Sequence, residues 1–290
     1  MAFSDNVVLM RGRLYLLLLP AFFFVTFFYV YPITQLFWLS LTKWDGFTPP
    51  VYIGLKNYYY LFNDPVFYIA LKNNFTWAII FLIANNGLAL FLAGTIDIMR
   101  PRVGQFFRIV LYLSSLTSIV VISTLFRAVY EYNIGLLNTI LRSIGLKPIG
   151  WLSDPNLALY SILASSIWQY ASWPMLIFLS AFAGISPAIL EAAKIDGANE
   201  WQIFWKIKLP CIWPVILAIL VLTWIWNSQP FAQVWTMTFG GPGHATEVLA
   251  TYLYRLAFSG MELGYASALS VILLLMIFPV GILLVKVFER

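Results

Sequence analysis

Six long stretches without a charged side chain limit what this chain of 290 residues can fold into. A helix of roughly 20 residues crosses a bilayer core, and backbone polar groups in hydrocarbon must be paired within helices or closed barrels. The stretches are too long for barrel strands, and charged residues make up only 10% of the chain, against roughly 25% in soluble domains. We therefore predict membrane-spanning helices at residues 14–41, 75–96, 109–126, 157–185, 212–239 and 263–285.

The lysine and arginine residues orient these predicted spans, because such residues gather in cytoplasmic loops. Ten of the 17 fall in segments that are cytoplasmic if the N-terminus is inside, although these total only about 56 residues against about 86 outside. We predict one all-α integral membrane domain, residues 1–290, with six spans, both termini in the cytoplasm and an uncleaved first span. The net charge of +5 then reflects topology, and no basic module suggests nucleic-acid binding.

The sequence lacks the residues that several kinds of chemistry require. The sequence has no G-x-x-x-x-G-K-[S/T] loop to hold nucleotide phosphates, and no predicted span contains a charged residue that could relay protons. His244 has no second histidine and no cysteine near it, and Cys211 is the single cysteine. We predict no catalytic residue, no metal site, no internal disulfide and no cofactor bound by this chain.

A polar segment, residues 186–211, separates the fourth and fifth predicted spans, and we call it the insert. It contains the sequence EAAKIDGANEWQIFWKIKLP, with six charged residues. EAAKID favours helix, Gly197 interrupts it, and Asn199 followed by Gln202 predicts a new capped helix. Trp201, Phe204 and Trp205 would share one broad face of that helix, where they could pack on the bundle, lie at the lipid interface or fill a groove on a cytoplasmic partner.

The insert also carries seven residues at fixed spacing. They are Glu191, Ala192, Ala193, Gly197, Ile207, Leu209 and Pro210. This pattern resembles the cytoplasmic signature of the membrane subunits of bacterial binding-protein-dependent ABC importers. IDGA at 195–198 is similar to the carbohydrate branch, and residues 17–32, 53–74, 151–158 and 240–246 resemble its maltose and glycerol-phosphate permeases. The resemblance extends over nearly the whole chain; Ser186 and Phe239 depart from the usual pattern.

The resemblance implies a role and a set of partners. The insert would be the coupling segment, with Gly197 forming its turn and with Glu191 and Asp196 as candidates for orienting polar contacts. The expected partners are a second, related permease subunit, two ATPase subunits that use ATP and Mg²⁺, an extracytoplasmic solute-binding protein, and the lipid of the cytoplasmic membrane. This chain would then be a noncatalytic subunit.

Neutral polar and aromatic residues at helical spacing mark a candidate substrate pathway in the fourth and fifth predicted spans. One set is spaced i, i+3, i+4, i+7 and the other i, i+4, i+7, so each shares a helix face. The sets are Ser166, Gln169, Tyr170 and Trp173, and Thr223, Asn227 and Pro230. Such groups suit sugar hydroxyls and the apolar face of a sugar ring. Any one of these aromatics could equally face lipid or pack between helices, and Asn85 and Asn86 could bond between helices.

We predict an importer permease for a sugar or oligosaccharide. Glycerol phosphate, another polyol or an acidic sugar is the alternative, and would favour a cavity-facing arginine or lysine. An ion-driven secondary transporter and a membrane scaffold are the alternatives from other classes.

Overall fold

The computed structural model describes residues 18–288, so the first four residues of the predicted span 14–41 lie outside the described part. The chain is mostly helical and divides into two compact units. One unit comprises residues 1–63 and 253–273, and the other comprises residues 64–252 and 274–290.

The smaller unit contains helices and a short hairpin. The hairpin pairs Thr42 with Tyr52 and Lys43 with Val51 in antiparallel register, which corrects the all-α prediction. Asn57 holds it in place, because its Nδ2 donates to the carbonyl oxygens of Ser40 and Thr42, both at 2.8 Å. The elements here are η1 (Thr26–Val30), α2 (Tyr31–Ser40), β1 (Thr42–Lys43), β2 (Val51–Tyr52), α3 (Lys56–Phe62), η3 (Arg255–Ser259), and parts of α15 (Leu249–Tyr254) and α16 (Leu263–Phe288).

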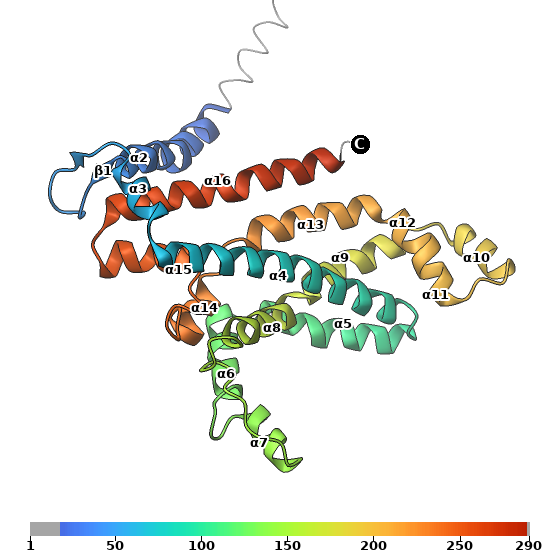
Figure 1. Cartoon of the computed structure of the whole chain (residues 1–290). Coiled ribbons are helices and arrows are strands. Elements are labelled where there is room, and N and C mark those ends of the chain that lie inside the picture. The colour runs from blue at the N-terminus through green and yellow to red at the C-terminus, as the bar shows by residue number, and fades with distance from the viewer. Residues whose placement is uncertain (1–17, 289–290) are drawn as a thin grey trace, which may run out of the picture. The chain divides into compact units, whose positions relative to one another are not determined.

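The larger unit contains the other helices (Figure 1). They are α4 (Pro65–Asp97), α5 (Pro101–Leu116), α6 (Ile119–Val129), α7 (Leu136–Ser143), α8 (Ala158–Tyr170), α9 (Ser172–Ala183), α10 (Pro187–Ile195), α11 (Glu200–Ile203), η2 (Phe204–Lys208), α12 (Leu209–Cys211), α13 (Trp213–Asn227) and α14 (Ala232–Thr238). Helix α4 starts ten residues before the predicted span because Asp64 accepts a hydrogen bond from Val66 N (2.8 Å) and Pro65 opens the first turn.

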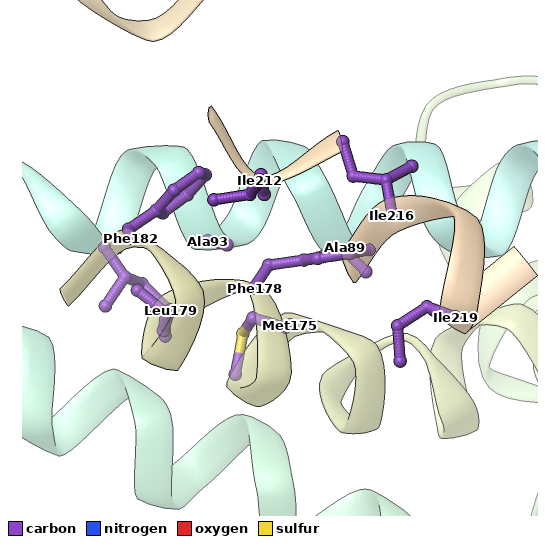
Figure 2. Close-up of a cluster of buried hydrophobic side chains, with 10 residues drawn as sticks. Ala89, Ala93, Met175, Phe178, Leu179, Phe182, Ile212, Ile216 and Ile219 are labelled. Atoms are coloured by element: carbon purple, nitrogen blue, oxygen red, sulfur yellow. The ribbon is translucent and has the colours of Figure 1, made fainter. Parts of the chain in front are cut away.

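The core of this unit lies where α4, α9 and α13 pack against one another (Figure 2). Ala89 and Ala93, one turn apart on α4, are completely buried, and Phe178 of α9 is buried with them. Lipid tails are as apolar as these side chains, so helix packing in a membrane depends on close van der Waals contact. Small residues on α4 permit that contact.

Two predicted spans are not single straight helices. Residues 109–126 fall on α5 and α6, which meet at a bend of 98°. The bend is held by Gln169, whose Nε2 donates to Thr117 O (3.1 Å) and whose own carbonyl oxygen accepts from Ser115 Oγ (2.8 Å). The predicted span 212–239 is not one continuous helix: α13 ends at Asn227 and α14 begins at Ala232, because Pro230 lacks the N–H that Trp226 O would need.

Smaller differences concern the fourth and fifth predicted spans. The fourth span is interrupted at Ala171, between α8 and α9. Pro210 lies in α12, the segment Glu200–Cys211 meets α13 at a 70° bend, and Pro214 lies in the first turn of α13. Four helices in the described part are long and apolar enough to cross a membrane, or six if each bent pair is one span.

Candidate functional site

A cavity of about 460 Å³ lies among the helices of the larger unit. Its wall is formed by aromatic, amide, hydroxyl and aliphatic side chains, and none of the described lining residues is charged. The lining residues are Asn85, Tyr112, Ser115, Ile119, Tyr170, Trp173, Pro174, Thr223, Trp226, Asn227, Gln229, Pro230, Phe231, Ala232 and Gln233. They come from seven helices and from the break between α13 and α14.

Most of the predicted pathway residues meet at this cavity. Those that line it are Tyr170, Trp173, Thr223, Asn227 and Pro230. The two helix faces that the spacing indicated are therefore brought together around one space. The structure places the break at Pro230 in the wall, where the end of α13 leaves backbone groups without helical partners.

Ser166 and Gln169 do not line the cavity. Ser166 is completely buried, and its Oγ donates to Ile162 O at 3.0 Å within α8. Gln169 is 1% exposed, and its Oε1 accepts a hydrogen bond from Gln233 Nε2 at 3.2 Å. Together with its bond to Thr117, this contact gives Gln169 a structural role between the α5–α6 bend and α14.

Four polar residues of the wall were not predicted from the sequence: Tyr112 and Ser115 on α5, and Gln229 and Gln233 around the break after α13. Tyr112 and Ser115 lie three residues apart on α5, so their shared face was a signal in the sequence. Gln229 and Gln233 lie beyond Asn227, where α13 ends, on either side of Pro230. The i, i+4, i+7 spacing reached Pro230 but selects neither glutamine, because the helix is broken between Asn227 and Ala232.

Two features of the wall suit a polar ligand with an apolar face. The rings of Trp173 and Trp226 lie with centroids 4.9 Å apart and form an aromatic corner. Asn85 is 2% exposed, and its Oδ1 has no hydrogen-bond partner among the described residues. A buried amide oxygen without a partner costs free energy unless a ligand or water satisfies it.

The insert forms the predicted helix, turn and helix. Asn199 Oδ1 accepts from Gln202 N at 2.8 Å, and Gln202 Oε1 accepts from Asn199 N at 2.9 Å, so the predicted cap is confirmed as a reciprocal capping box. Gly197 has φ +83°, a conformation that L side chains rarely adopt, and it makes the turn. Lys194 and Glu200 pair across this turn at 3.0 Å.

The three aromatic side chains of the insert lie together on one side, as predicted: the ring centroids of Trp201 and Trp205 are 5.5 Å apart, those of Phe204 and Trp205 are 5.5 Å apart, and those of Trp201 and Phe204 are 6.4 Å apart. Trp201 and Trp205 are 68% and 52% exposed, whereas Phe204 turns inward and packs on Phe182 of α9, with ring centroids 6.0 Å apart. A groove of about 290 Å³ lies between these aromatics and α4. Of the other predicted coupling residues, Glu191, Ala192, Asp196 and Pro210 are exposed, Ile207 and Leu209 are half-buried, and Ala193 is buried.

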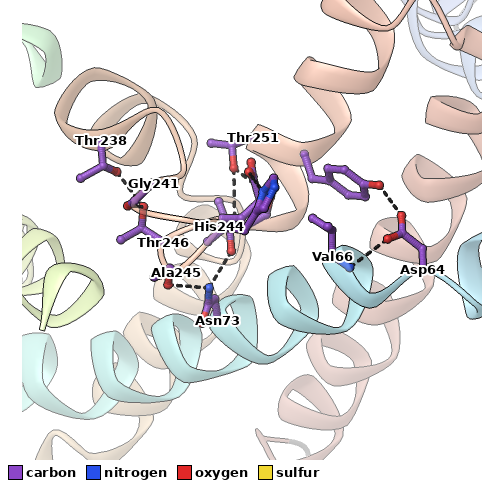
Figure 3. A network of polar contacts seen from close by, with 12 residues as sticks. Asp64, Val66, Asn73, Thr238, Gly241, His244, Ala245, Thr246 and Thr251 are labelled. Atoms are coloured by element: carbon purple, nitrogen blue, oxygen red, sulfur yellow. Dashed lines mark hydrogen bonds and ion pairs between the residues drawn. The ribbon is translucent and has the colours of Figure 1, made fainter. Parts of the chain in front are cut away.

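The loop that contains His244 is fixed to α4 by hydrogen bonds (Figure 3). Asn73 Nδ2 donates to the carbonyl oxygens of Ala245 and Glu247, both at 2.9 Å. His244 Nδ1 lies 2.9 Å from Glu247 Oε2. At the N-terminal end of α4, Tyr252 donates its hydroxyl to Asp64.

Several apolar helices, among them two pairs joined at sharp bends, surround an uncharged polar cavity beside a polar insert, and this is the architecture of a multi-pass membrane protein. The family model of the binding-protein-dependent transport system inner membrane component matches residues 85–290, and the chain belongs to this family. The resemblance to ABC importer permeases is thereby confirmed. Members are transmembrane components, so the chain is a noncatalytic subunit.

Known relatives are similar along almost the whole chain. The probable ABC transporter permease protein YurN of Bacillus subtilis is 37% identical over 279 residues, which cover 95% of each chain. The lactose transport system permease protein LacF of Rhizobium radiobacter is 33% identical over 268 residues, covering 91% of this chain and 89% of that one. A crystal structure of a bacterial ABC transporter that imports the acidic polysaccharide alginate contains a chain with a TM-score of 0.86 and 26% identity, with 98% of each chain covered.

Proposed function

We propose that this chain forms one half of the translocation pathway of an ATP-driven importer for a neutral sugar or oligosaccharide. The observation that carries the proposal is the cavity wall, in which amides and hydroxyls surround the corner of Trp173 and Trp226. Amides can bond sugar hydroxyls, and flat rings can pack on the apolar face of a sugar. The name of the lactose permease relative supports the same class of solute.

The alternative solutes, an acidic sugar or glycerol phosphate, differ from a neutral sugar in their charge. An acidic sugar or glycerol phosphate would be recognised best by an arginine or lysine. None of the described lining residues is cationic, although the importer with the similar chain carries acidic alginate. A neutral sugar therefore fits this half of the pathway better, and a cation in the other half would be needed for an acidic one.

The energy would come from a separate ATPase, because this sequence has no P-loop. The exposed Trp201 and Trp205 lie directly after the capped turn at Gly197, where they can enter a cleft on a partner protein. We propose that two ATPase subunits, which use ATP and Mg²⁺, contact the insert. A second, related permease would complete the pathway, and an extracytoplasmic solute-binding protein would deliver the sugar.

Reconstitution tests this function. The chain and its partner permease are placed in liposomes with and without the ATPases, and uptake of labelled neutral and acidic oligosaccharides is followed with the binding protein present. We expect uptake of the neutral sugar only with ATPase and ATP. Uptake without the ATPase that collapses when an ionophore removes ion gradients would instead identify a secondary transporter.

We also propose that the chain has six spans with both termini and the insert in the cytoplasm. Cys211, the single cysteine, is exposed at the end of the insert and provides a direct test. A membrane-impermeant maleimide should label it in inside-out vesicles and not in intact spheroplasts. Labelling from outside would contradict the topology and, with it, the coupling role of the insert.

A further inference from the structure

Lys208, the last residue of η2 in the insert, is buried against a helix that lies far away along the chain. Its Nζ pairs with Asp97 Oδ2, and Asp97 is the last residue of α4, 111 positions earlier. The Lys208 side chain is 8% exposed and the Asp97 side chain is 24% exposed. Removing one partner from such a shielded pair leaves the other charge uncompensated, which costs far more than at the surface.

A second contact joins the same two segments one turn away. Phe204 lies four residues before Lys208, and Gly94 lies three residues before Asp97, so each pair shares a helix face. A Cβ atom built on Gly94 would lie only 2.6 Å from Cε2 of Phe204. The Phe204 ring therefore rests directly on the bare backbone of α4, and a side chain at position 94 would force that ring to shift.

Helix α9 takes part in the same contact. Lys208 Nζ lies 5.8 Å from the centroid of the Phe182 ring, and the Phe204 ring packs against the same Phe182. We name the set formed by Phe204, Lys208, Gly94, Asp97 and Phe182 the clamp. It combines an ion pair, a cation–π contact and a ring seated on a glycine, and so it fixes the end of the insert to α4 and α9 in one geometry.

We propose that the clamp transmits displacement of the insert sideways to α4, with Lys208 and Asp97 as its positioning residues. This inference rests on the proposed coupling function. The insert leads through α12 directly into α13, so the backbone itself can move α13. Helix α4 lies far away in the sequence and lines the cavity through Asn85, so its movement depends on packed contacts of this kind.

Reporters on α4 and α13 separate the two routes. Single cysteines are introduced in place of the exposed Lys72 on α4 and the exposed Ile225 on α13, after Cys211→Ser removes the native cysteine. The purified complex with its ATPases is trapped with ATP, Mg²⁺ and vanadate, and maleimide labelling rates are compared with those of the nucleotide-free complex. In the otherwise unchanged chain we expect both labelling rates to change about fivefold or more. Fivefold is roughly the smallest effect that coupling between two sites typically has on an equilibrium.

Variants of the clamp should change the labelling response at position 72 only. Lys208→Met is expected to abolish the change at position 72 and to preserve it at position 225, while ATP hydrolysis continues. The double variant Lys208→Asp with Asp97→Lys restores opposite charges and should recover the response at position 72. Lys286→Met removes an exposed lysine near the end of α16 as the matched control and should leave both responses intact.

Each remaining outcome has a defined meaning. If Lys208→Met preserves both responses, or abolishes both, the sideways route is overturned. The milder variants Asp97→Asn and Gly94→Ala are measured in parallel, and the same selective loss in them supports the clamp even if Lys208→Met fails to fold; retained responses in both would overturn it. No response at either reporter in the unmutated complex, although ATP is hydrolysed, would instead refute the proposed coupling function.

Discussion

The cavity and the insert, both in the larger unit, are built in opposite ways. The cavity wall is assembled from positions spread between Asn85 and Gln233, and none of its described residues carries a charge. The insert is one continuous segment of 26 residues with six charged side chains and two exposed tryptophans. A wall of neutral groups suits a small solute that must bind and leave, whereas exposed aromatics beside charges suit a protein partner.

This difference implies that the two regions can be damaged separately. Changes in the cavity should alter the apparent KM for the sugar and leave ATP hydrolysis intact. Changes in the insert should alter the coupling of hydrolysis to uptake and leave solute recognition intact. Variants in each region can therefore be compared in the same uptake and ATPase assays.

Replacing Gly197 should have the largest effect. Its φ of +83° costs an L residue roughly 1–2 kcal/mol, so Gly197→Leu should displace the turn of the insert. We expect near-complete loss of uptake while the chain still inserts and the ATPases still hydrolyse ATP, measured in proteoliposomes. Gly145→Leu is the matched control, because Gly145 has φ +78° and is equally open but lies outside the insert. Equal loss in both variants would mean that backbone strain alone explains the result.

Loss of an amide from the cavity should produce the next largest effect. Asn227 lines the cavity, and its Nδ2 makes only a long bond of 3.3 Å to Thr223 O. A lost hydrogen bond to a buried ligand costs about 1–3 kcal/mol, so Asn227→Ala should raise the apparent KM about 5- to 150-fold. Uptake kinetics measure this, with basal ATP hydrolysis unchanged.

Asn156→Ala, an exposed amide in the loop before α8, is the control for Asn227→Ala and should leave KM unchanged. A fall in ATP hydrolysis without a change in KM in Asn227→Ala would contradict the separation of the two regions. It would show that Asn227 acts in coupling and does not act in solute recognition.

Removing the exposed tryptophans of the insert should weaken assembly. Trp201→Ala and Trp205→Ala each delete an apolar anchor, and such anchors at interfaces typically contribute about 2 kcal/mol or more. We expect less ATPase to copurify with the chain in detergent, with the cavity-dependent KM unaffected in the complexes that remain. Trp213→Ala, which removes a 54% exposed tryptophan just beyond the insert, is the control. Equal loss of ATPase in all three variants would indicate general destabilisation.

The smallest expected effect is a loss of local stability in the loop of Asp45 at low pH. Backbone and side-chain donors of Thr48, together with Phe47 N, lower the pKa of Asp45 from 3.8 to about 2. The folded loop therefore gains stability from Asp45 at pH values above 3.8 and loses it as the pH falls towards 2. Hydrogen exchange at Phe47 and Thr48 should accelerate over this range beyond its intrinsic pH dependence. Asp45→Asn should remove the extra acceleration, and an unchanged profile in that variant would exclude Asp45 as its source.

Solute recognition in the cavity should not depend on pH as the stability of the Asp45 loop does. The described cavity lining has no charged group, so we expect the sugar KM to stay constant between about pH 5 and 8 if the wall alone determines recognition. A KM that follows a titration in this range would point to an ionisable group supplied by the partner permease or the binding protein.

The insert was largely readable from the sequence, because its determinants are local. Asn199 and Gln202 cap the same turn, and Gly197 supplies a backbone conformation that other residues resist, so short-range rules were enough to predict helix, turn and helix. The inward turn of Phe204 was not readable, since Gly94 and Phe182, which receive its ring, lie on other helices.

For the cavity, the 3.6-residue period was enough to predict the helix faces that carry Tyr170, Trp173, Thr223 and Asn227, because it sets the direction of each side chain. Which polar residues of those faces reach the cavity depended on how the helices pack and where they break. Gln169 lies on the predicted face and is nevertheless used to hold a bend in α5–α6, while Gln233 enters the wall after a helix break that resets the period. Periodicity is a property of one helix, whereas a cavity depends on where several helices break and how closely they pack.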